Sequence, residues 1–236
     1  DTPLDEVAQI IEKYDLVAIP VLDSIGRLVG QITVDDVMDE VREQSERDYQ
    51  LASGLSQDVE TDDNVFRQTT ARLPWLIIGM LGGIGNSMIL GNFDATFAAH
   101  PEMALYIPLI GGTGGNVGTQ SSALIVQGLA NSSLDSKNTL KQVAKEAVVA
   151  LINATIISLL VYTYNFIRFG AMATVTYSVS ISLFAVVMFA SIFGTLVPMT
   201  LERLKIDPAI ATGPFIAITN DIIGMMLYMG ITVLLS

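Results

Sequence analysis

The last two thirds of the chain contain five long apolar stretches that alternate with short polar segments. They cover residues 74–92, 104–127, 146–168, 177–200 and 208–235. A helix needs about 20 mostly apolar residues to cross the hydrocarbon core of a bilayer, and each stretch is close to that length or longer. The pattern therefore predicts a mainly α-helical protein in which residues 61–236 form a domain of five spans in a lipid bilayer.

The first third of the chain has a different pattern. The residues that follow Thr2 are typical of a helix start, and this helix is expected to end near Tyr14. Two apolar segments, "LVAIPVLD" and "LVGQIT", flank a turn at Gly26 and predict a pair of strands. A second helix start at residues 33–36 opens a long acidic helix that runs to about residue 51. These elements make up only part of a domain, and the chain has no initiator methionine, so we expect a piece of a longer protein.

The charge of the chain divides at the same place as its hydropathy. Residues 1–73 carry a net charge of −11, whereas the remaining residues together carry −1. An acidic surface disfavours nucleic acid as a partner, because phosphate binding needs basic side chains, and it is compatible with cations. The chain has no cysteine, which excludes disulfides and thiolate metal sites.

The distribution of lysine and arginine predicts the orientation in the membrane. Basic residues are enriched on the cytoplasmic side of membrane proteins. Seven basic residues flank the spans on one side and one lies on the other, which predicts a cytoplasmic N-terminus and an outside C-terminus. The seven are Arg67, Arg72, Lys137, Lys141, Lys145, Arg203 and Lys205, and the one is Arg168.

The first apolar stretch is rich in small residues. We favour close helix packing as the reason, because glycine lets two helix backbones approach each other. The residues concerned are Gly79, Gly82, Gly83, Gly85 and Asn86.

The second apolar stretch contains "PLIGGTGGNVGTQSS". Its glycines form two overlapping pairs at a spacing of four, Gly111 with Gly115 and Gly114 with Gly118, and such pairs allow the close approach of another helix. The segment lacks the lysine and the spacing of a phosphate-binding loop. Amide side chains exposed to lipid lose their water partners at a cost in free energy. Asn116, Thr119 and Gln120 are therefore expected to face protein or a water-filled path.

The fifth apolar stretch contains an acidic residue, Asp221, near mid-depth of the membrane. No basic residue lies at a comparable depth in any predicted span. An unpaired carboxylate there holds a cation or a proton, and acids at this depth mark ion or proton paths. The alternative is a protonated side chain that is hydrogen-bonded to a neighbouring helix. Gly213 and Pro214 predict a break in the helix that frees backbone carbonyls.

The residue types around Asp221 indicate a hard cation. Carboxylate, amide and carbonyl oxygens suit Mg²⁺, Ca²⁺ or Mn²⁺, and the chain has no cluster of softer ligands. In a two-fold dimer, two copies of Asp221 would supply two negative charges for one divalent ion.

In combination, four motifs strongly resemble the MgtE family of magnesium channels. They are "KYDLVAIPVLDSIGRLVGQITVDDVMDEV", "RLPWLIIGML", "PLIGGTGGNVGTQS" and "DPAIATGPFIAITNDIIG". The resemblance implies that residues 1–34 are part of a second CBS domain, an α/β fold, and that residues 35–60 form the helix that the family uses as a plug. It also implies a homodimer in a bacterial inner membrane, with a Mg²⁺ pore on the two-fold axis that closes when cytosolic Mg²⁺ binds.

The same resemblance suggests roles for individual residues. Asp221 matches the pore aspartate, and Asp36 and Asp39 match acidic positions that bind regulatory Mg²⁺. Arg47 departs from the family by adding a positive charge to that acidic surface. The expected pore lining consists of Gly112, Gly115, Asn116, Thr119, Gln120, Gly213 and Ala217.

Two other classes of function are compatible with a mid-membrane acid. A proton-coupled transporter of a small solute or another divalent cation also uses a single aspartate and broken helices, and this alternative stays open. An intramembrane hydrolase is disfavoured, because the only histidine, His100, lies in an outside loop and no second acid lies at the depth of Asp221. We therefore expect a protein that is not an enzyme. The residues do not decide whether a nucleotide binds the incomplete CBS domain.

Overall fold

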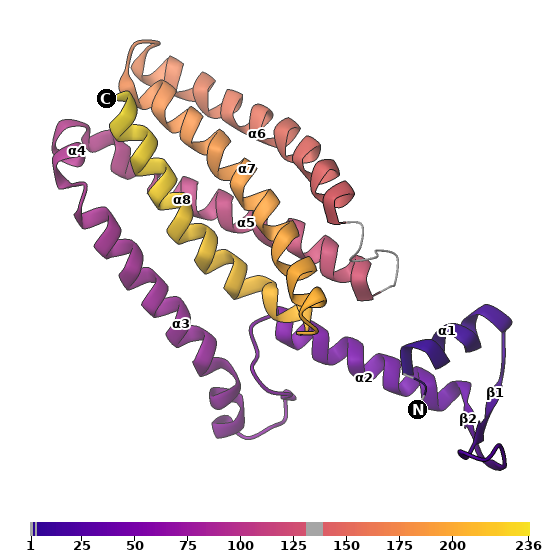
Figure 1. The fold of residues 1–236 in the computed structure, drawn as a ribbon. Coiled ribbons are helices and arrows are strands. Elements are labelled where there is room, and N and C mark those ends of the chain that lie inside the picture. Colours follow the sequence, from indigo (N-terminus) through magenta and orange to yellow (C-terminus); the bar gives the residue numbers. More distant parts are fainter. Residues whose placement is uncertain (1, 3, 131–138) are drawn as a thin grey trace. The chain divides into compact units, whose positions relative to one another are not determined.

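A computed structural model describes residue 2, residues 4–130 and residues 139–236 (Figure 1). Lys137, which contributes to the charge asymmetry of the loops, lies outside the described residues. The chain divides into two compact units, residues 1–50 and residues 51–236. Each unit is described separately.

The first unit contains the predicted helix, hairpin and helix. Helix α1 (Leu4–Tyr14) precedes strands β1 (Ala18–Leu22) and β2 (Leu28–Thr33), and α2 (Val34–Ala52) follows. The strands pair antiparallel, with Ala18 opposite Thr33. The turn between them depends on Asp23, whose Oδ1 accepts hydrogen bonds from the backbone N–H groups of residues 25 and 27, and on Gly26, whose φ of +79° suits glycine. The order of elements that the sequence predicts is confirmed.

The start of α2 is a side-chain cap, as its sequence predicts. The Asp36 Oδ2 atom accepts hydrogen bonds from the Thr33 hydroxyl at 2.6 Å and from the Thr33 backbone N–H at 2.9 Å. The Asp36 N–H in turn donates to the Thr33 hydroxyl oxygen at 3.4 Å. Such reciprocal bonds satisfy backbone donors that the first turn of a helix leaves free.

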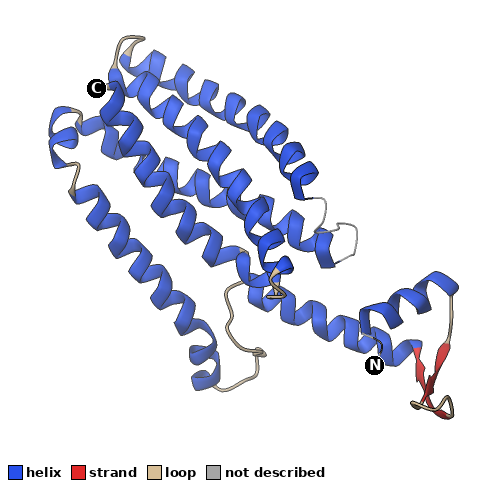
Figure 2. Ribbon diagram, viewed as in Figure 1, coloured by secondary structure: helices blue, strands red, loops and turns tan. Residues whose placement is uncertain are grey.

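The second unit is built almost entirely of helices (Figure 2). Its elements are α3 (Val65–Gly91), α4 (Asp94–Ala99), the 3₁₀ helix η1 (Pro101–Tyr106), α5 (Ile107–Ala130), α6 (Thr139–Phe169), α7 (Thr174–Arg203), the 3₁₀ helix η3 (Pro208–Ala211) and α8 (Gly213–Leu235).

Helix α3 begins nine residues before the apolar stretch that predicts it. The cause is a polar cap, because the Asn64 Oδ1 atom accepts a hydrogen bond from the Arg67 N–H at 2.9 Å. Apolarity marks the part of a helix suited to lipid, whereas hydrogen bonding decides where the helix starts.

Four described helical segments are long and apolar enough to cross a membrane: α3, α6, α7 and residues 208–235, which comprise η3 and α8. Helix α5 has 24 residues, which correspond to a length of about 36 Å. Its glycines and polar side chains interrupt the apolar residues, so no 18-residue stretch of α5 is as apolar as those of the other four segments. Membrane embedding through four helices is therefore supported, and the crossing by α5 stays a prediction.

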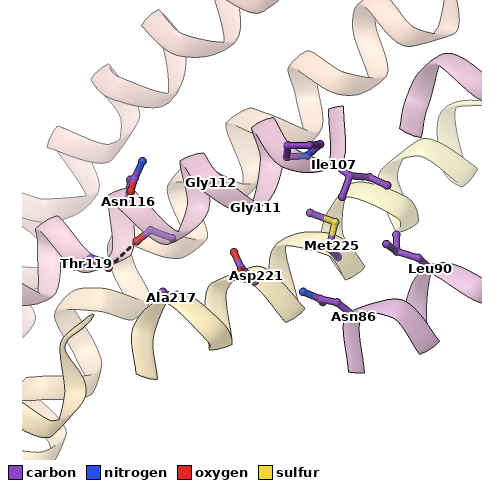
Figure 3. A pocket seen from close by; sticks show the side chains of 12 residues that line it. Asn86, Leu90, Ile107, Gly111, Gly112, Asn116, Thr119, Ala217, Asp221 and Met225 are labelled. Atoms are coloured by element: carbon purple, nitrogen blue, oxygen red, sulfur yellow. Dashed lines mark hydrogen bonds between the residues drawn. The ribbon is translucent and has the colours of Figure 1, made fainter. Parts of the chain in front are cut away.

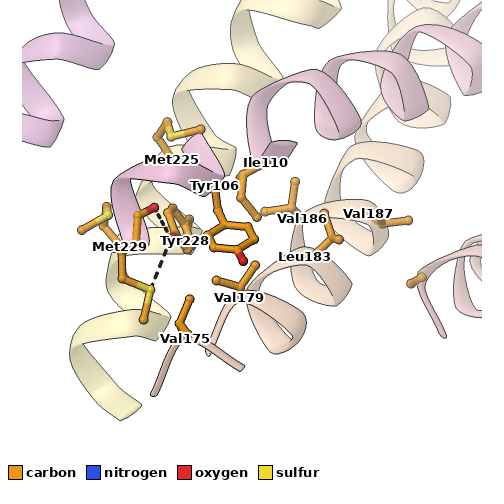
Figure 4. Close-up of a cluster of buried hydrophobic side chains, with 12 residues drawn as sticks. Tyr106, Ile110, Val175, Val179, Leu183, Val186, Val187, Met225, Tyr228 and Met229 are labelled. Atoms are coloured by element: carbon orange, nitrogen blue, oxygen red, sulfur yellow. Dashed lines mark hydrogen bonds between the residues drawn. The ribbon is translucent and has the colours of Figure 1, made fainter. Parts of the chain in front are cut away.

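The buried core of the second unit lies where α5, α7 and α8 pack against one another (Figure 4). Helix α6 packs against α7. Its apolar side chains include Ile110 and Leu183. Two tyrosine hydroxyls find partners inside it: Tyr228 donates to the Met103 carbonyl oxygen at 2.7 Å, and Tyr106 donates to the Asn165 side chain. These hydrogen bonds let polar groups lie inside an apolar cluster.

Three helices approach one another closely around Gly118 of α5. A Cβ atom at this position would lie well under 3.0 Å from the Asn220 amide of α8. One at Gly194 of α7 would also lie under 3.0 Å from the Gly118 carbonyl oxygen. The glycines thus allow the backbone contact that the spacing in this stretch predicts.

The segment before α8 is broken close to the predicted position. The 3₁₀ helix η3 ends at Ala211, and α8 begins at Gly213 with Pro214 in its first turn. Gly213 has a φ of +44°, and a side chain there would clash with the Ala52 carbonyl oxygen. The position therefore favours glycine for both conformation and space.

Candidate ion site

A cleft of about 390 Å³ opens between α3, α5 and α8 (Figure 3). Its wall combines backbone-exposing glycines, a few amide and hydroxyl groups and a single carboxylate. The lining residues are Asn86, Leu90, Ile107, Pro108, Gly111, Gly112, Gly115, Asn116, Thr119, Ala217, Asp221 and Met225.

Asp221 is the only charged residue in this lining, and its carboxylate points from α8 toward α5. Two glycines of α5 face it. An ideal Cβ atom at Gly111 would lie 3.3 Å from the Asp221 Oδ1 atom, and one at Gly115 would lie 3.7 Å from it. Because neither glycine has a side chain, the carboxylate lies beside the bare helix backbone with open space in front of it.

Within the part of the chain that the structure describes, no ion pair involves Asp221. The residue is half-buried in a helix that is apolar enough to cross a membrane. A carboxylate in such surroundings needs a proton or a cation, because low polarity penalises an uncompensated charge. The site is thus suited to one of these two positive species.

The other polar groups of the cleft are neutral oxygen donors. The Thr119 hydroxyl donates to the Gly115 carbonyl oxygen at 2.8 Å, which leaves the hydroxyl oxygen free to accept a hydrogen bond. The Asn116 side chain is exposed on α5. Among the described residues, no three or more His, Cys, Asp or Glu side chains are grouped so that they could hold a metal ion. One chain therefore offers one carboxylate and several neutral oxygens, a set better matched to a hydrated ion than to a stripped one.

The structure brings most of the predicted pore residues to one place. Five of the seven predicted lining residues share the cleft with Asp221: Gly112, Gly115, Asn116, Thr119 and Ala217. The remaining two lie elsewhere. Gln120 is exposed on α5 beyond the cleft, and Gly213 forms the first turn of α8. The role of all seven in an ion path stays a prediction.

Six residues of the cleft are absent from the sequence-based set of site residues, and two of these six, Gly111 and Asn86, bear on the ion site. Gly111 belongs to a glycine pair that was interpreted as a packing contact, and it is the glycine nearest to the Asp221 carboxylate. Asn86 belongs to the small-residue run that was also attributed to packing, and it lines the cleft from α3. The spacing of both residues indicates close contact with another helix, but the sequence does not say which helix each one faces.

The acidic residues predicted to bind regulatory Mg²⁺ lie on α2. Hydrogen bonds from the Thr33 hydroxyl and N–H lower the pKa of Asp36 below its ordinary value, so this carboxylate is charged and partly occupied by the cap. Asp39 is exposed one turn further along. Arg47 donates to Glu43 at 2.7 Å and to Glu40 at 3.3 Å. The departure at Arg47 therefore neutralises part of the acidic surface within the same helix.

Comparison with known families decides the class of this protein. The family described as "MgtE: Divalent cation transporter" matches residues 107–231, which carry α5, α6, α7 and most of α8 with Asp221. The chain belongs to the MgtE family. The CBS domain family matches residues 1–43, in agreement with the resemblance of the first unit. The MgtE family is described as one of transporters and not as a class of enzymes.

Three relatives named magnesium transporter MgtE match nearly the whole chain. The protein from Bacillus subtilis is 34% identical over 227 residues, which are 96% of this chain and 50% of the relative. The protein from Thermus thermophilus is 34% identical over 241 residues, covering 100% and 52%. The protein from Enterococcus faecalis is 30% identical over 233 residues, covering 96% and 50%. The chain thus spans about half the length of the curated relatives it matches.

Proposed function

We propose that this chain conducts Mg²⁺ across a membrane and that the ion passes through the cleft beside Asp221. The observation that carries the proposal is a carboxylate without an ion-pair partner among the described residues, in a cleft between membrane-type helices of an MgtE family member. The names of the three relatives support magnesium as the ion.

The chemistry of the cleft favours an ion that keeps part of its water shell. Mg²⁺ sheds water reluctantly and is commonly held by one or two carboxylates with several waters in place. Asp221 supplies one charge, and Asn116 and Thr119 supply neutral oxygens that accept hydrogen bonds from bound water. The chain has no cysteine and a single histidine, so ligands for softer metals are scarce.

The open side of the cleft supports a dimer. Gly112, Asn116 and Gln120 form an exposed stripe on α5 at a spacing of four residues. Polar amides at membrane depth need water or protein partners. A second copy of the chain, related by a two-fold axis along this stripe, would enclose the cleft and bring a second Asp221 to the ion. In this homodimer α5 also crosses the membrane, so that each subunit has five spans.

The orientation follows from the basic residues next to the spans. Arg67, Arg72, Arg203 and Lys205 lie at the ends of α3 and α7 that connect to cytoplasmic loops in this proposal. The first unit is then cytoplasmic, and the end of α8 is outside. All three relatives come from bacteria, which supports the bacterial plasma membrane as the location.

Cytosolic Mg²⁺ is the proposed regulator, acting through the acidic face of α2. Asp36 and Asp39 are three residues apart on this helix, which places them on one face. Replacing both by asparagine removes two charges and keeps a side chain at position 36 that can still cap the helix, since asparagine caps well. The double variant should raise the Mg²⁺ concentration that closes the pathway in the full-length protein. An unchanged closing concentration would count against sensing at these residues.

A proton-coupled transporter is the second candidate, because a lone carboxylate such as Asp221 also binds a proton. The two candidates differ in what drives the flux. Mg²⁺ entry into liposomes that contain a Mg²⁺-sensitive dye should follow the Mg²⁺ gradient at equal pH on both sides. A strict requirement for a pH gradient would favour the transporter and exclude the passive pathway.

A further inference from the structure

Helix α3 approaches α8 through two of its glycines. An ideal Cβ atom at Gly82 would lie 2.5 Å from the Cγ2 atom of Ile218, and one at Gly79 would lie 3.8 Å from its Cδ1 atom. By contrast, a Cβ atom at Gly83 or Gly85 would have nothing within 4 Å. Only one face of α3 therefore contacts α8, and Gly79 and Gly82 define that face.

Asn86 lies on the same face, one helical turn beyond Gly82. On α8, Asp221 follows Ile218 at a spacing of three residues, which also keeps the two on one face. The glycine contact at Ile218 thus brings the next turn of α3 to the level of Asp221. Asn86 lines the cleft that contains the Asp221 carboxylate, and its amide extends from α3 toward α8 (Figure 3).

The amide oxygen of Asn86 lacks a hydrogen-bond partner in the described part of the chain. Its Oδ1 atom is buried all the same. An amide oxygen without a partner inside an apolar helix bundle costs free energy that a leucine at the same position would not. Packing alone therefore gives no reason for an asparagine here. In Figure 3 the amide nitrogen of Asn86 is the atom that points toward α8. A half-turn of the amide exchanges its oxygen and nitrogen, and a group that donates hydrogen bonds inside the cleft would then satisfy Oδ1.

We propose that Asn86 is a further residue of the ion site, whose Oδ1 atom accepts a hydrogen bond from a water molecule of the hydrated divalent cation at Asp221. The inference rests on the proposed function, since it needs a cation in the cleft. It makes α3 a third wall of the ion site beside α5 and α8. It also extends the site beyond residues 107–231, the segment that matches the MgtE family.

The test compares four variants with the wild type in liposomes that contain a Mg²⁺-sensitive dye. Asn86→Leu keeps the size of the side chain and removes the acceptor, so the half-saturating Mg²⁺ concentration should rise about fivefold, the effect of one hydrogen bond of about 1 kcal/mol. Asn86→Asp adds a charge opposite the cation and should lower that concentration. Ser87→Ala changes an exposed neighbour in α3 and should leave the half-saturating Mg²⁺ concentration unchanged. Asp221→Asn should abolish the flux.

Opposite shifts in the two Asn86 variants are the result that a packing role does not produce. The inference is overturned if Asn86→Leu and Asn86→Asp both keep the wild-type half-saturating concentration. It is also overturned if both raise that concentration and both lower the unfolding temperature in detergent, because asparagine is then needed for packing. If the wild type passes no Mg²⁺, or Asp221→Asn passes as much as the wild type, the proposed function itself fails and the role of Asn86 falls with it.

Discussion

A Cβ atom at Gly111 of α5 would lie 3.3 Å from the Oδ1 atom of Asp221 on α8. The carboxylate therefore faces a helix surface without side chains. This relationship explains how a glycine-rich helix and an acidic residue more than 100 positions later form one site. It also makes the size of the residue at position 111 a direct probe of the space in front of the carboxylate.

Gly111→Ala should reduce Mg²⁺ flux without lowering the stability of the protein. The added methyl group would also lie 3.6 Å from the Met225 Cε atom, so it fits after a small shift, but it occupies space beside Oδ1. Alanine favours a helix over glycine, so the unfolding temperature in detergent should not fall. Dye-based flux and thermal unfolding measure the two effects. Gly83→Ala, where the added atom meets nothing within 4 Å, is the control. Equal flux in both variants would show that the space at Gly111 does not matter.

The Gly118→Ala variant should not fold correctly. The added Cβ atom would overlap the Asn220 amide and would approach the Ile216 Cγ2 atom at 2.8 Å. Overpacking of a tight core costs about 1–3 kcal/mol, and more where the backbone cannot move. The amount of protein that elutes as a single species in detergent should drop sharply. Gly230→Ala on α8 adds a methyl group in open space and should be tolerated. Normal yield and stability of Gly118→Ala would contradict the close crossing of α5, α7 and α8.

The sequence predicts where the helices lie along the chain better than it predicts which helices pack against each other. Apolar length located α7 and the segment 208–235 to within a few residues, whereas α6 already includes Thr139, seven residues before its apolar stretch. Side-chain caps shift such boundaries, as Asn64 does for α3. Glycine spacing indicated that α5 packs closely, but it could not show that Gly111 faces Asp221 whereas Gly118 faces Asn220. That distinction depends on how neighbouring helices are rotated, which one sequence does not contain.

A buried polar cluster should contribute strongly to the stability of the second unit. The Glu146 side chain of α6 is only 9% exposed and accepts hydrogen bonds from Ser121 of α5, at 2.7 Å, and from Ser191 of α7. Replacing both serines by alanine leaves the carboxyl group without these donors, at a cost of about 1–3 kcal/mol. Thermal unfolding in detergent should therefore shift to a lower temperature.

The control for this cluster is Thr163→Ala, also on α6. The Thr163 hydroxyl is exposed and donates only within its own helix, to the Leu159 carbonyl oxygen at 2.8 Å. Its loss should leave the unfolding temperature nearly unchanged. An unfolding temperature of the double serine variant equal to that of Thr163→Ala would refute the contribution of the Glu146 cluster.

The cap of α2 should depend on pH in a defined direction. Hydrogen bonds from Thr33 lower the pKa of Asp36 from its ordinary value of 3.8. A carboxylate with a lowered folded-state pKa stabilises the fold above 3.8, and this stabilisation is lost as the pH falls through the lower folded value. Thr33→Val removes the hydroxyl donor, so the pKa of Asp36 should rise toward 3.8. Carboxyl chemical shifts followed by NMR during an acid titration measure this change. Identical titration of Asp36 in both proteins would contradict the cap.

The most direct test of the proposed role of Asp221 compares Asp221→Asn with Asp207→Asn in the same flux assay. Both variants replace an acid by an amide in residues 207–221, but Asp207 caps η3 by accepting the Ala209 N–H at 2.8 Å, a role that asparagine can take over. Liposomes with the wild type or Asp207→Asn should admit Mg²⁺ at similar rates, and those with Asp221→Asn should admit almost none. Wild-type Mg²⁺ entry through Asp221→Asn would contradict the claim that the Asp221 carboxylate holds the ion.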